Sequence, residues 1–119
     1  MNNPTAVASL AALAQESRLA IYRQLVEAGP TGLSVGEIGA SLRIAPATLT
    51  FHLSQLSQAG LVAARQDGRY IYYSANYKRM NDLLAYLSEN CCARDSPDCA
   101  TGCGPERPAR ASKRATTLK

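Results

Sequence analysis

One stretch of the chain, APATLTFHLSQLSQAGLVAARQDGRYIYY at residues 45–73, constrains the fold more than any other. Leu49, Leu53 and Leu56 follow one another at i, i+4 and i+7, which places all three on one face of a helix. Pro46 suits the first helical position, where its missing N–H costs nothing. The first half of the stretch therefore predicts a short helix with one apolar face.

The second half of the same stretch predicts a β-hairpin. Gly60 suits the position just past the end of a helix, and Asp67-Gly68 is a strong two-residue turn signal between two strands. With this turn, Gln66 faces Arg69 across the hairpin. A helix followed at once by a hairpin with a charged tip is typical of a winged helix that reads DNA.

Three further helices are predicted before this stretch. Two cover Thr5–Ala14 and Ser17–Glu27, and the third opens at Ser34, which forms an S-x-x-E capping box with Glu37. A short turn joins the third helix to the helix at Pro46, which is the spacing of a helix-turn-helix. The chain is therefore predicted to be mainly α (α+β), a winged helix-turn-helix with five helices and one β-hairpin.

The fifth helix is predicted to start at Asn76 or Tyr77 and to continue to Cys92. Large apolar residues follow one another along it at helical spacing: Met80, Leu83, Leu84 and Leu87. Beyond a complete winged helix, such a stripe favours the seam of a homodimer, shared with Leu10 of the first helix. Packing of the stripe within one subunit is the alternative.

Composition and charge limit the classes of protein to consider. The 119 residues suit one modest domain, and no apolar run approaches the roughly 20 residues that a membrane helix needs. The N-terminus lacks a basic and apolar leader, so a reducing cytoplasmic location is expected. Residues 1–94 are predicted to form the DNA-binding and dimerisation domain, and residues 95–119 a flexible tail that carries cysteines and basic residues. The whole net charge of +4 lies after Cys103, so DNA binding must depend on individually placed groups.

The helix at Pro46 has a second, polar face that suits DNA. Hydroxyl and amide groups there can reach base edges and phosphates, and a large apolar group can contact a thymine methyl. The candidate residues on this helix are Ala47, Thr48, Thr50, Phe51 and Gln55. In the hairpin, Arg65 and Arg69 flank the tip, where they would reach the DNA backbone; a solvated edge is the alternative.

Two aromatic residues of the same helix have competing interpretations. Phe51 either contacts DNA or is partly buried against a neighbouring element. His52 lies beside the leucines and is predicted to be a hydrogen-bonded structural residue, because no second histidine is available for a metal site.

The chain contains four cysteines, all of them in the run CCARDSPDCATGC. Any three of these thiolates suit a pyramidal site for a trivalent metalloid, and all four, Cys91, Cys92, Cys99 and Cys103, suit tetrahedral zinc or cadmium. Reversible oxidation of a pair, as in a redox sensor, is the third reading. Adjacent side chains of a helix diverge, so Cys91 and Cys92 can share an ion only where the helix end turns.

The chain resembles the ArsR/SmtB family of small dimeric metal-sensing repressors over roughly residues 5–92. The resemblance rests on SRLAIYRQLVEAG, LSVGEIGASLRIAPATLTFHLSQLSQAGLV and RQDGRYIYYS. It implies a winged-helix homodimer, packed through its first and last helices, that represses an operon until an inducer ion binds. The chain is similar to the arsenical-repressor subgroup, in which a Cys-Cys pair ends the last helix and a third cysteine follows.

Departures from the family pattern also carry information. Leu33–Glu37 has no cysteine, and the last helix has no histidine of the kind that the zinc and cadmium sensors use. Ala45 stands where a serine usually opens the recognition helix, so its cap is expected to come from elsewhere. Phe51 stands where a basic residue is common.

The function predicted from these observations is an arsenite- or antimonite-responsive repressor that binds double-stranded operator DNA as a homodimer. The metalloid would bind Cys91, Cys92 and Cys99 and release the DNA. The alternatives are a cadmium, lead or zinc sensor with four cysteine ligands, a thiol redox regulator, and a metalloid-binding protein without a DNA function. No nucleophile–base constellation or phosphate-binding loop suggests an enzyme, and no membrane partner is expected.

Overall fold

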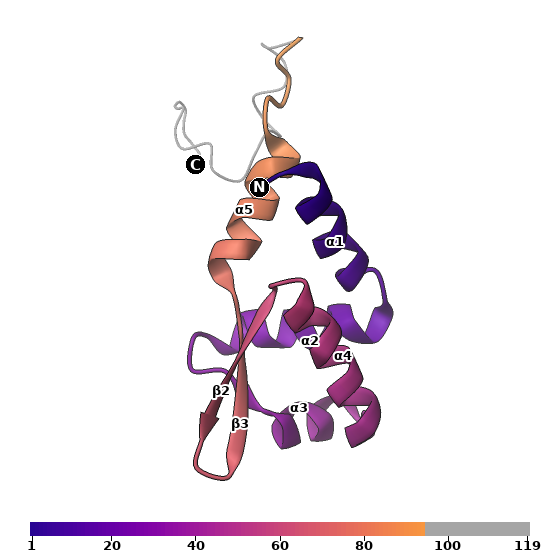
Figure 1. Cartoon of the computed structure of the whole chain (residues 1–119), viewed down its shortest axis with the longest axis vertical. Helices are drawn as coiled ribbons and strands as arrows, with labels where there is room; N and C mark the ends of the chain where they lie inside the picture. Colours follow the sequence, from indigo (N-terminus) through magenta and orange to yellow (C-terminus); the bar gives the residue numbers. More distant parts are fainter. Residues whose placement is uncertain (95–119) are drawn as a thin grey trace. The chain divides into compact units, whose positions relative to one another are not determined.

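The computed structural model describes residues 1–94, which form helices and one small antiparallel sheet (Figure 1). The helices are α1 (Asn3–Leu13), α2 (Glu16–Ala28), α3 (Val35–Leu42), α4 (Pro46–Gln58) and α5 (Tyr77–Ser88). The strands are β1 (Leu33–Ser34), β2 (Val62–Asp67) and β3 (Tyr70–Ala75). Five helices and a hairpin wing confirm the predicted winged helix-turn-helix. No helix within the described part of the chain has the length and apolarity that crossing a membrane requires.

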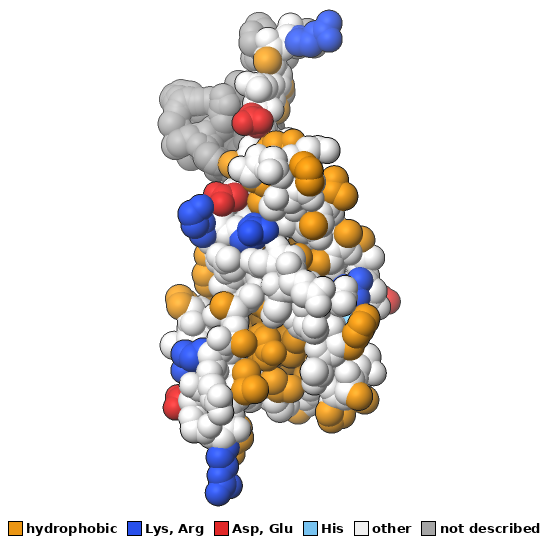
Figure 2. Space-filling model, in the orientation of Figure 1, with side chains coloured by type: hydrophobic (Ala, Val, Ile, Leu, Met, Phe, Trp, Pro, Cys, Tyr) orange, Lys and Arg blue, Asp and Glu red, His pale blue; other side chains and the backbone are white. Residues whose placement is uncertain are grey.

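The sheet has the strand order β1-β3-β2, so a short strand that the sequence did not reveal extends the hairpin. Leu33 and Ser34 pair with Tyr73 and Tyr72, which attaches the wing to the segment just before α3. With only two residues, β1 is too short to show an alternating pattern in the sequence. The hairpin carries basic side chains at its far end (Figure 2).

The predicted hairpin turn lies one residue too early, so each predicted cross-strand partner is wrong by two residues. Asp67 pairs with Tyr70, so Gly68 and Arg69 form the turn in place of Asp67 and Gly68. Gly68 has φ 65°, while Arg69 is not among the residues with positive φ. A glycine in the left-handed region at the first central position alone is the pattern of a type II′ turn, whereas an Asp-Gly turn of type I′ needs positive φ at both central positions.

The ends of two helices also differ from the prediction. α1 begins at Asn3, two residues before Thr5, because the Asn2 side chain accepts a hydrogen bond from the Thr5 N–H (2.9 Å) and Pro4 occupies the first turn. α5 ends at Ser88 and does not reach Cys92, whose φ is 61°. The left-handed backbone at Asn90 and Cys92 is incompatible with a continuing helix.

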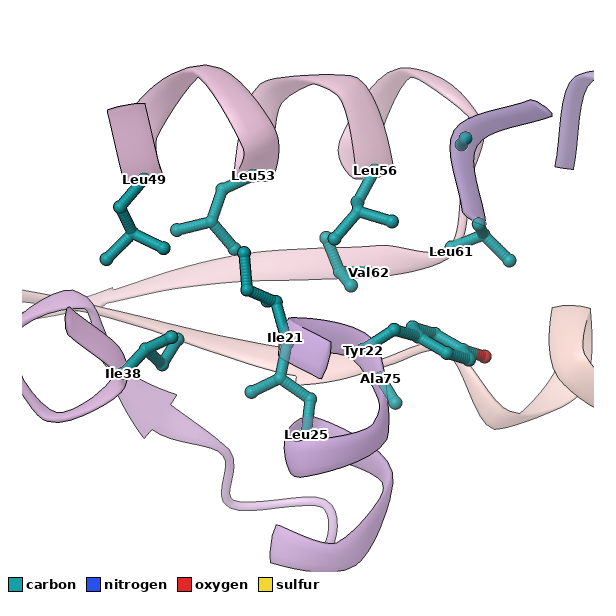
Figure 3. Packing of buried hydrophobic residues seen from close by; sticks show 11 residues of the cluster. Ile21, Tyr22, Leu25, Ile38, Leu49, Leu53, Leu56, Leu61, Val62 and Ala75 are labelled. Atoms are coloured by element: carbon teal, nitrogen blue, oxygen red, sulfur yellow. The ribbon is translucent and has the colours of Figure 1, made fainter. Parts of the chain in front are cut away.

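The core lies beneath α4, where the three predicted leucines point at α2 and the sheet (Figure 3). Leu49, Leu53 and Leu56 have exposed fractions of 1% or less, and they meet Ile21 and Leu25 of α2. Burying each leucine contributes about 1.5–3 kcal/mol to the free energy of unfolding. This packing fixes which face of α4 points outward.

The core belongs to a compact unit that covers Met1–Asn81. The remainder of α5 and the turn that follows it belong to a second unit that begins at Asp82, and we describe it separately.

Candidate nucleic-acid interface and cysteine site

The turn between α3 and α4 brings the two helices close together. The predicted capping box opens α3: the Glu37 N–H donates to Ser34 Oγ (3.1 Å), and the Ser34 N–H donates to Glu37 Oε1 (2.8 Å). Arg43 is the C-cap of α3, and its φ of 57° turns the chain sharply after Leu42. A Cβ added at Gly39 would lie 3.4 Å from a methyl group of Leu49, so α3 and α4 approach each other closely at this point. The helix-turn-helix thus holds α4 in one orientation.

The face of α4 opposite the leucines is open to solvent. Ala47, Thr48, Thr50 and Phe51 are exposed, while Gln55 is half-buried. The exposed fraction of Phe51 is 56%, so no neighbouring element of the described chain buries it, and the alternative of partial burial is wrong. Its ring contacts that of His52 at a centroid distance of 5.8 Å. The exposed face has the size and polarity to enter a major groove.

The start of α4 has no side-chain cap among the described residues. Ala45 occupies the N-cap position, where no side-chain cap hydrogen bond forms. Within residues 1–94, the expectation that another residue supplies the cap is therefore wrong. Pro46 at the first helical position removes one of the donors that a cap would satisfy.

His52 is a structural residue, as predicted. It is 7% exposed, and its Nδ1 lies 3.4 Å from Nη1 of Arg18. Arg18 also donates from Nε to the Ala12 carbonyl (2.7 Å), near the end of α1. One guanidinium therefore connects α1, α2 and α4. Arginine at this position could not be singled out from the sequence, since its partners lie on other elements.

The two arginines of the wing differ in their surroundings. Arg69 lies in the exposed turn between β2 and β3. Arg65 lies further back, where its Nη2 donates to the Thr31 carbonyl (3.0 Å), its Nη1 is 3.6 Å from Asp67 Oδ2, and its guanidinium lies 5.0 Å from the ring centroid of Tyr72. The sequence predicted the same role for both, but Arg65 contacts other parts of the chain, whereas Arg69 lies at the tip of the wing.

The cysteine pair follows α5 in a turn. The Cys91 N–H donates to the Ser88 carbonyl (3.0 Å), and the Ala93 N–H donates to the Asn90 carbonyl (3.0 Å). The Sγ atoms of Cys91 and Cys92 are 3.6 Å apart. The chain thus meets the condition that the pair converges only where the helix ends.

Cysteine sulfurs suit a soft ion, and two of the four cysteines, Cys91 and Cys92, lie within the described residues. In a tetrahedral zinc site with Zn–S distances of about 2.3 Å, the sulfurs lie about 3.8 Å apart. The observed 3.6 Å therefore fits two thiolates that share one ion. Cys99 and Cys103 lie outside the described residues, and no group of three potential ligands occurs within residues 1–94.

The residues predicted at a dimer seam are exposed to different degrees. Leu10 is 42% exposed, Leu84 43% and Leu87 58%. Leu83 is 6% exposed, and Met80 packs against the core. These two residues fit the alternative that the stripe packs within one subunit. In α1 the small residues face inward, and Figure 2 shows hydrophobic side chains over the surface of this helix.

Comparison with known proteins gives the family. Residues 13–65 match the helix-turn-helix domain family. The uncharacterized HTH-type transcriptional regulator YceK of Bacillus subtilis is 46% identical over 63 residues, which cover 53% of this chain and 62% of YceK. The transcriptional activator HlyU of Vibrio cholerae is 36% identical over 89 residues, covering 72% of this chain and 80% of HlyU. The arsenical resistance operon repressor of Bacillus subtilis is 32% identical over 81 residues, covering 68% of this chain and 73% of that protein.

Solved structures agree with these relatives. HlyU from Vibrio cholerae superimposes with a TM-score of 0.58 at 34% identity, covering 71% of this chain and 91% of that one. An ArsR-like transcriptional regulator from Rhodococcus gives a TM-score of 0.62 at 26% identity, covering 71% and 76%. With the helix-turn-helix, the exposed face of α4 and the wing in place, the chain belongs to the ArsR/SmtB family of winged-helix transcriptional regulators.

Proposed function

We propose that this protein is a repressor that releases operator DNA when As(III) or Sb(III) binds its cysteines. The observation that carries the proposal is the pair of Sγ atoms, 3.6 Å apart, at the end of α5. The matches to arsenical resistance repressors support it, whereas the match to the activator HlyU shows that the family has other members. Activity, inducer and partners are therefore argued from the residues of this chain.

Three thiols are the chemistry that trivalent arsenic requires. Neutral As(OH)₃ exchanges its three hydroxyls for three cysteine sulfurs, and each thiol proton leaves with a hydroxyl as water. Cys91 and Cys92 supply two sulfurs, and we propose Cys99 as the third, with Cys103 as the alternative. All-sulfur ligation favours soft ions over magnesium, calcium or manganese.

DNA binding is proposed to use two copies of the chain. A homodimer would place two α4 helices in successive major grooves, about 34 Å apart along the operator. The α4 side chains that would read base edges or fix the position of the helix on DNA are those of Thr48, Thr50, Phe51 and Gln55. Ala47 would allow close approach of the helix to the DNA, and Arg69 would contact the DNA backbone. Because the unit Met1–Asn81 has no large excess of positive charge, symmetry and shape must supply much of the affinity.

Binding of the metalloid and binding of the operator are thermodynamically linked, so each is expected to weaken the other. If the metalloid weakens operator affinity by some factor, bound operator weakens metalloid affinity by the same factor. The test is fluorescence anisotropy of a labelled operator fragment, titrated with reduced protein with and without arsenite. Arsenite should weaken binding by about 5–150-fold, the usual range of allosteric coupling.

Variants of the cysteines separate the candidate sites. Cys91→Ser combined with Cys92→Ser should abolish the arsenite effect while operator affinity without arsenite stays within about twofold. Loss of the effect in Cys99→Ser but not in Cys103→Ser identifies the three-ligand site. A requirement for Cys103, with a response to cadmium or zinc, indicates the four-ligand site. An arsenite effect that survives in the double variant contradicts the proposal.

The two neighbouring Sγ atoms at the end of α5, 3.6 Å apart, also fit one second candidate, a thiol redox regulator. Oxidation would then release the operator without any metalloid. Repeating the titration after a mild oxidant and again after a thiol reductant distinguishes the two. Reversible weakening by the oxidant alone, in the absence of arsenite, would favour redox control.

A further inference from the structure

A joint connects the first turn of α5 to the end of α4, and we infer that it positions the recognition helix and transmits the state of α5 to it. The joint consists of Asn76 and Arg79 on one side and residues 59–61 on the other. All of these residues lie within the unit Met1–Asn81. The transmission half of the inference rests on the proposed function, while the positioning half does not.

Asn76 uses both ends of its side-chain amide in the joint. Its Nδ2 donates to the Gly60 carbonyl (2.9 Å), and its Oδ1 accepts from the Arg79 N–H (3.1 Å) in the first turn of α5. Its backbone N–H donates to the Leu61 carbonyl (2.8 Å). One residue therefore caps α5 and holds the turn that follows α4.

Arg79 reaches the end of α4 directly. Its Nη1 donates to the Ala59 carbonyl (2.8 Å), at the C-cap of α4. A cation at the C-terminal end of a helix is stabilised by the helix dipole, and a charged donor makes a stronger hydrogen bond than a neutral one. A Cβ at Gly60 would lie 2.8 Å from a guanidinium nitrogen of Arg79, so the glycine leaves the space that the guanidinium fills.

The joint provides a shorter connection than the chain itself. Between Ala59 and Arg79 the chain runs out along β2 and back along β3, a separation of 20 residues. The hydrogen bonds of the joint link the last turn of α4 directly to the first turn of α5, so we expect these two turns to move together. α5 is one continuous helix from Tyr77 to Ser88, and Cys91 follows it by three residues. A change of the cysteine turn can therefore reach α4 through α5 and Arg79.

The experiment compares four full-length variants with the wild type. Arg79→Met keeps the bulk of the side chain and removes its donors. Arg79→Lys keeps the charge and one donor group and serves as the conservative rescue. Asn76→Asp keeps the oxygen that caps α5 and removes the donor to Gly60. Arg23→Met, an exposed arginine on α2, is the control for the loss of one positive charge.

The first measurement is operator binding with and without arsenite, with circular dichroism to confirm folding. Arg79→Met and Asn76→Asp should bind arsenite as the wild type does, but the weakening of operator binding should fall below about threefold. Arg79→Lys should restore at least part of the weakening, and Arg23→Met should leave it unchanged. Full weakening in both Arg79→Met and Asn76→Asp overturns transmission through the joint.

The second measurement is hydrogen exchange without metalloid or DNA, which tests positioning alone. The amides at the end of α4 are hydrogen-bonded within the turn, as in Gly60 N–H to the Ser57 carbonyl (2.9 Å). Arg79→Met should speed their exchange by about tenfold relative to the amides of α3, because they open more often once the joint is lost. If these amides exchange in Arg79→Met at the wild-type rate, the proposal that Arg79 positions the end of α4 is wrong.

The two measurements also separate the failure of this inference from failure of the proposed function. If arsenite does not weaken operator binding by the wild type, the arsenite function and the transmission half fail together. The exchange experiment then still decides whether Arg79 positions α4. If the wild type responds to arsenite and only the joint variants do not, both proposals are supported.

Discussion

At the scale of single residues, Tyr22 carries a hydroxyl that the core does not use. The residue is 5% exposed, and its Oη has no hydrogen-bond partner among the described residues. Burial, with a smaller contribution from neighbouring Tyr77, raises the pKa of the Tyr22 phenol above its ordinary value. Tyr77, by contrast, donates to the Leu25 and Val26 carbonyls (3.3 and 2.9 Å), which belong to the last turn of α2.

We expect Tyr22→Phe to leave the free energy of unfolding at pH 7 unchanged or to raise it by up to about 1 kcal/mol, because an unpaired buried polar group is removed. Well below pH 10, as at pH 7, the phenol is neutral in both the folded and the unfolded state, and stability does not depend on pH through this group. As the pH rises past the unfolded pKa, the unfolded state ionises first, so wild-type stability falls, and Tyr22→Phe should lessen this alkaline loss.

The check is urea denaturation at pH 7 and at several pH values above 9. Tyr77→Phe is the matched control and should lower the free energy of unfolding by about 1 kcal/mol at pH 7. Equal losses in the two variants at pH 7 would mean that the Tyr22 hydroxyl has a partner after all.

The two arginines of the wing give a second prediction at this scale. Arg69→Met should weaken operator binding and reduce the slope of log affinity against log salt by about 1, as loss of one phosphate contact does. Arg65→Met should weaken binding by loosening the wing, with the slope unchanged, because its guanidinium is bound to Thr31, Asp67 and Tyr72. Anisotropy titrations at four salt concentrations measure both slopes; a similar fall in the two would assign Arg65 to the DNA backbone as well.

At the scale of elements, the backbone conformation of the hairpin turn predicts the effect of a substitution at Gly68. Gly68→Ala should lower the free energy of unfolding by about 1–2 kcal/mol, because Gly68 has φ 65° and the left-handed region disfavours a Cβ. No atom lies within 4 Å of the added Cβ, so the cost comes from the backbone alone. The measurement is thermal or urea unfolding followed by circular dichroism.

Gly36→Ala is the control with the opposite sign. Gly36 lies inside α3, where an added Cβ would meet only Ser34 Oγ at 4.0 Å. Alanine is the better helix former, so this variant should gain up to about 0.5–1 kcal/mol. A loss of stability at Gly36, or no loss at Gly68, would contradict the turn and helix assignments.

The helices could be predicted from the sequence because their signals are local. The leucine spacing of α4, Pro46 at its start and the Ser34–Glu37 capping box each depend on residues that are neighbours along the chain. The hairpin register could not be predicted, because Asp67-Gly68 and Gly68-Arg69 are both acceptable two-residue turns. The observed pairing of β2 with β3 selects the second turn, and β3 also pairs with β1, which lies 38 to 40 residues away along the chain.

The candidate site was predictable to the same extent. The exposed face of α4 follows from helix periodicity once the leucines are assigned to the core. The separate roles of Arg65 and Arg69 do not, since they depend on the Thr31 carbonyl and on the register. The joint at Arg79 was missed for the same reason. An asparagine before a helix was its only sequence signal, and that signal predicts the cap without the partner at Gly60.

At the scale of the whole molecule, the surface of α1 carries the argument for a dimer. The helix buries Ala6, Ser9 and Ala12, while its larger residues Val7 and Leu10 are 56% and 42% exposed. A helix that packs against its own chain through small residues and exposes large apolar ones has a second face without cover among the described residues. The proposed homodimer would cover it.

Leu10→Gln tests this directly, since glutamine forms helix nearly as well as leucine and the side chain adds nothing to the core. Loss of one largely buried leucine at an interface, about 1.5–3 kcal/mol, should raise the dimer dissociation constant by about 10–150-fold. Sedimentation equilibrium without DNA measures this constant, and because two copies of α4 are needed for a full operator, operator affinity should fall with it.

Ile71→Thr is the matched control, because Ile71 on β3 is 43% exposed, almost the same as Leu10. It should leave the dissociation constant unchanged, since the wing is proposed to face DNA and not the partner. If both substitutions weaken the dimer equally, exposed apolar area in general drives association. If neither does, the partner contact lies on other residues, and Leu84 and Leu87 of α5, at 43% and 58% exposed, become the next positions to substitute.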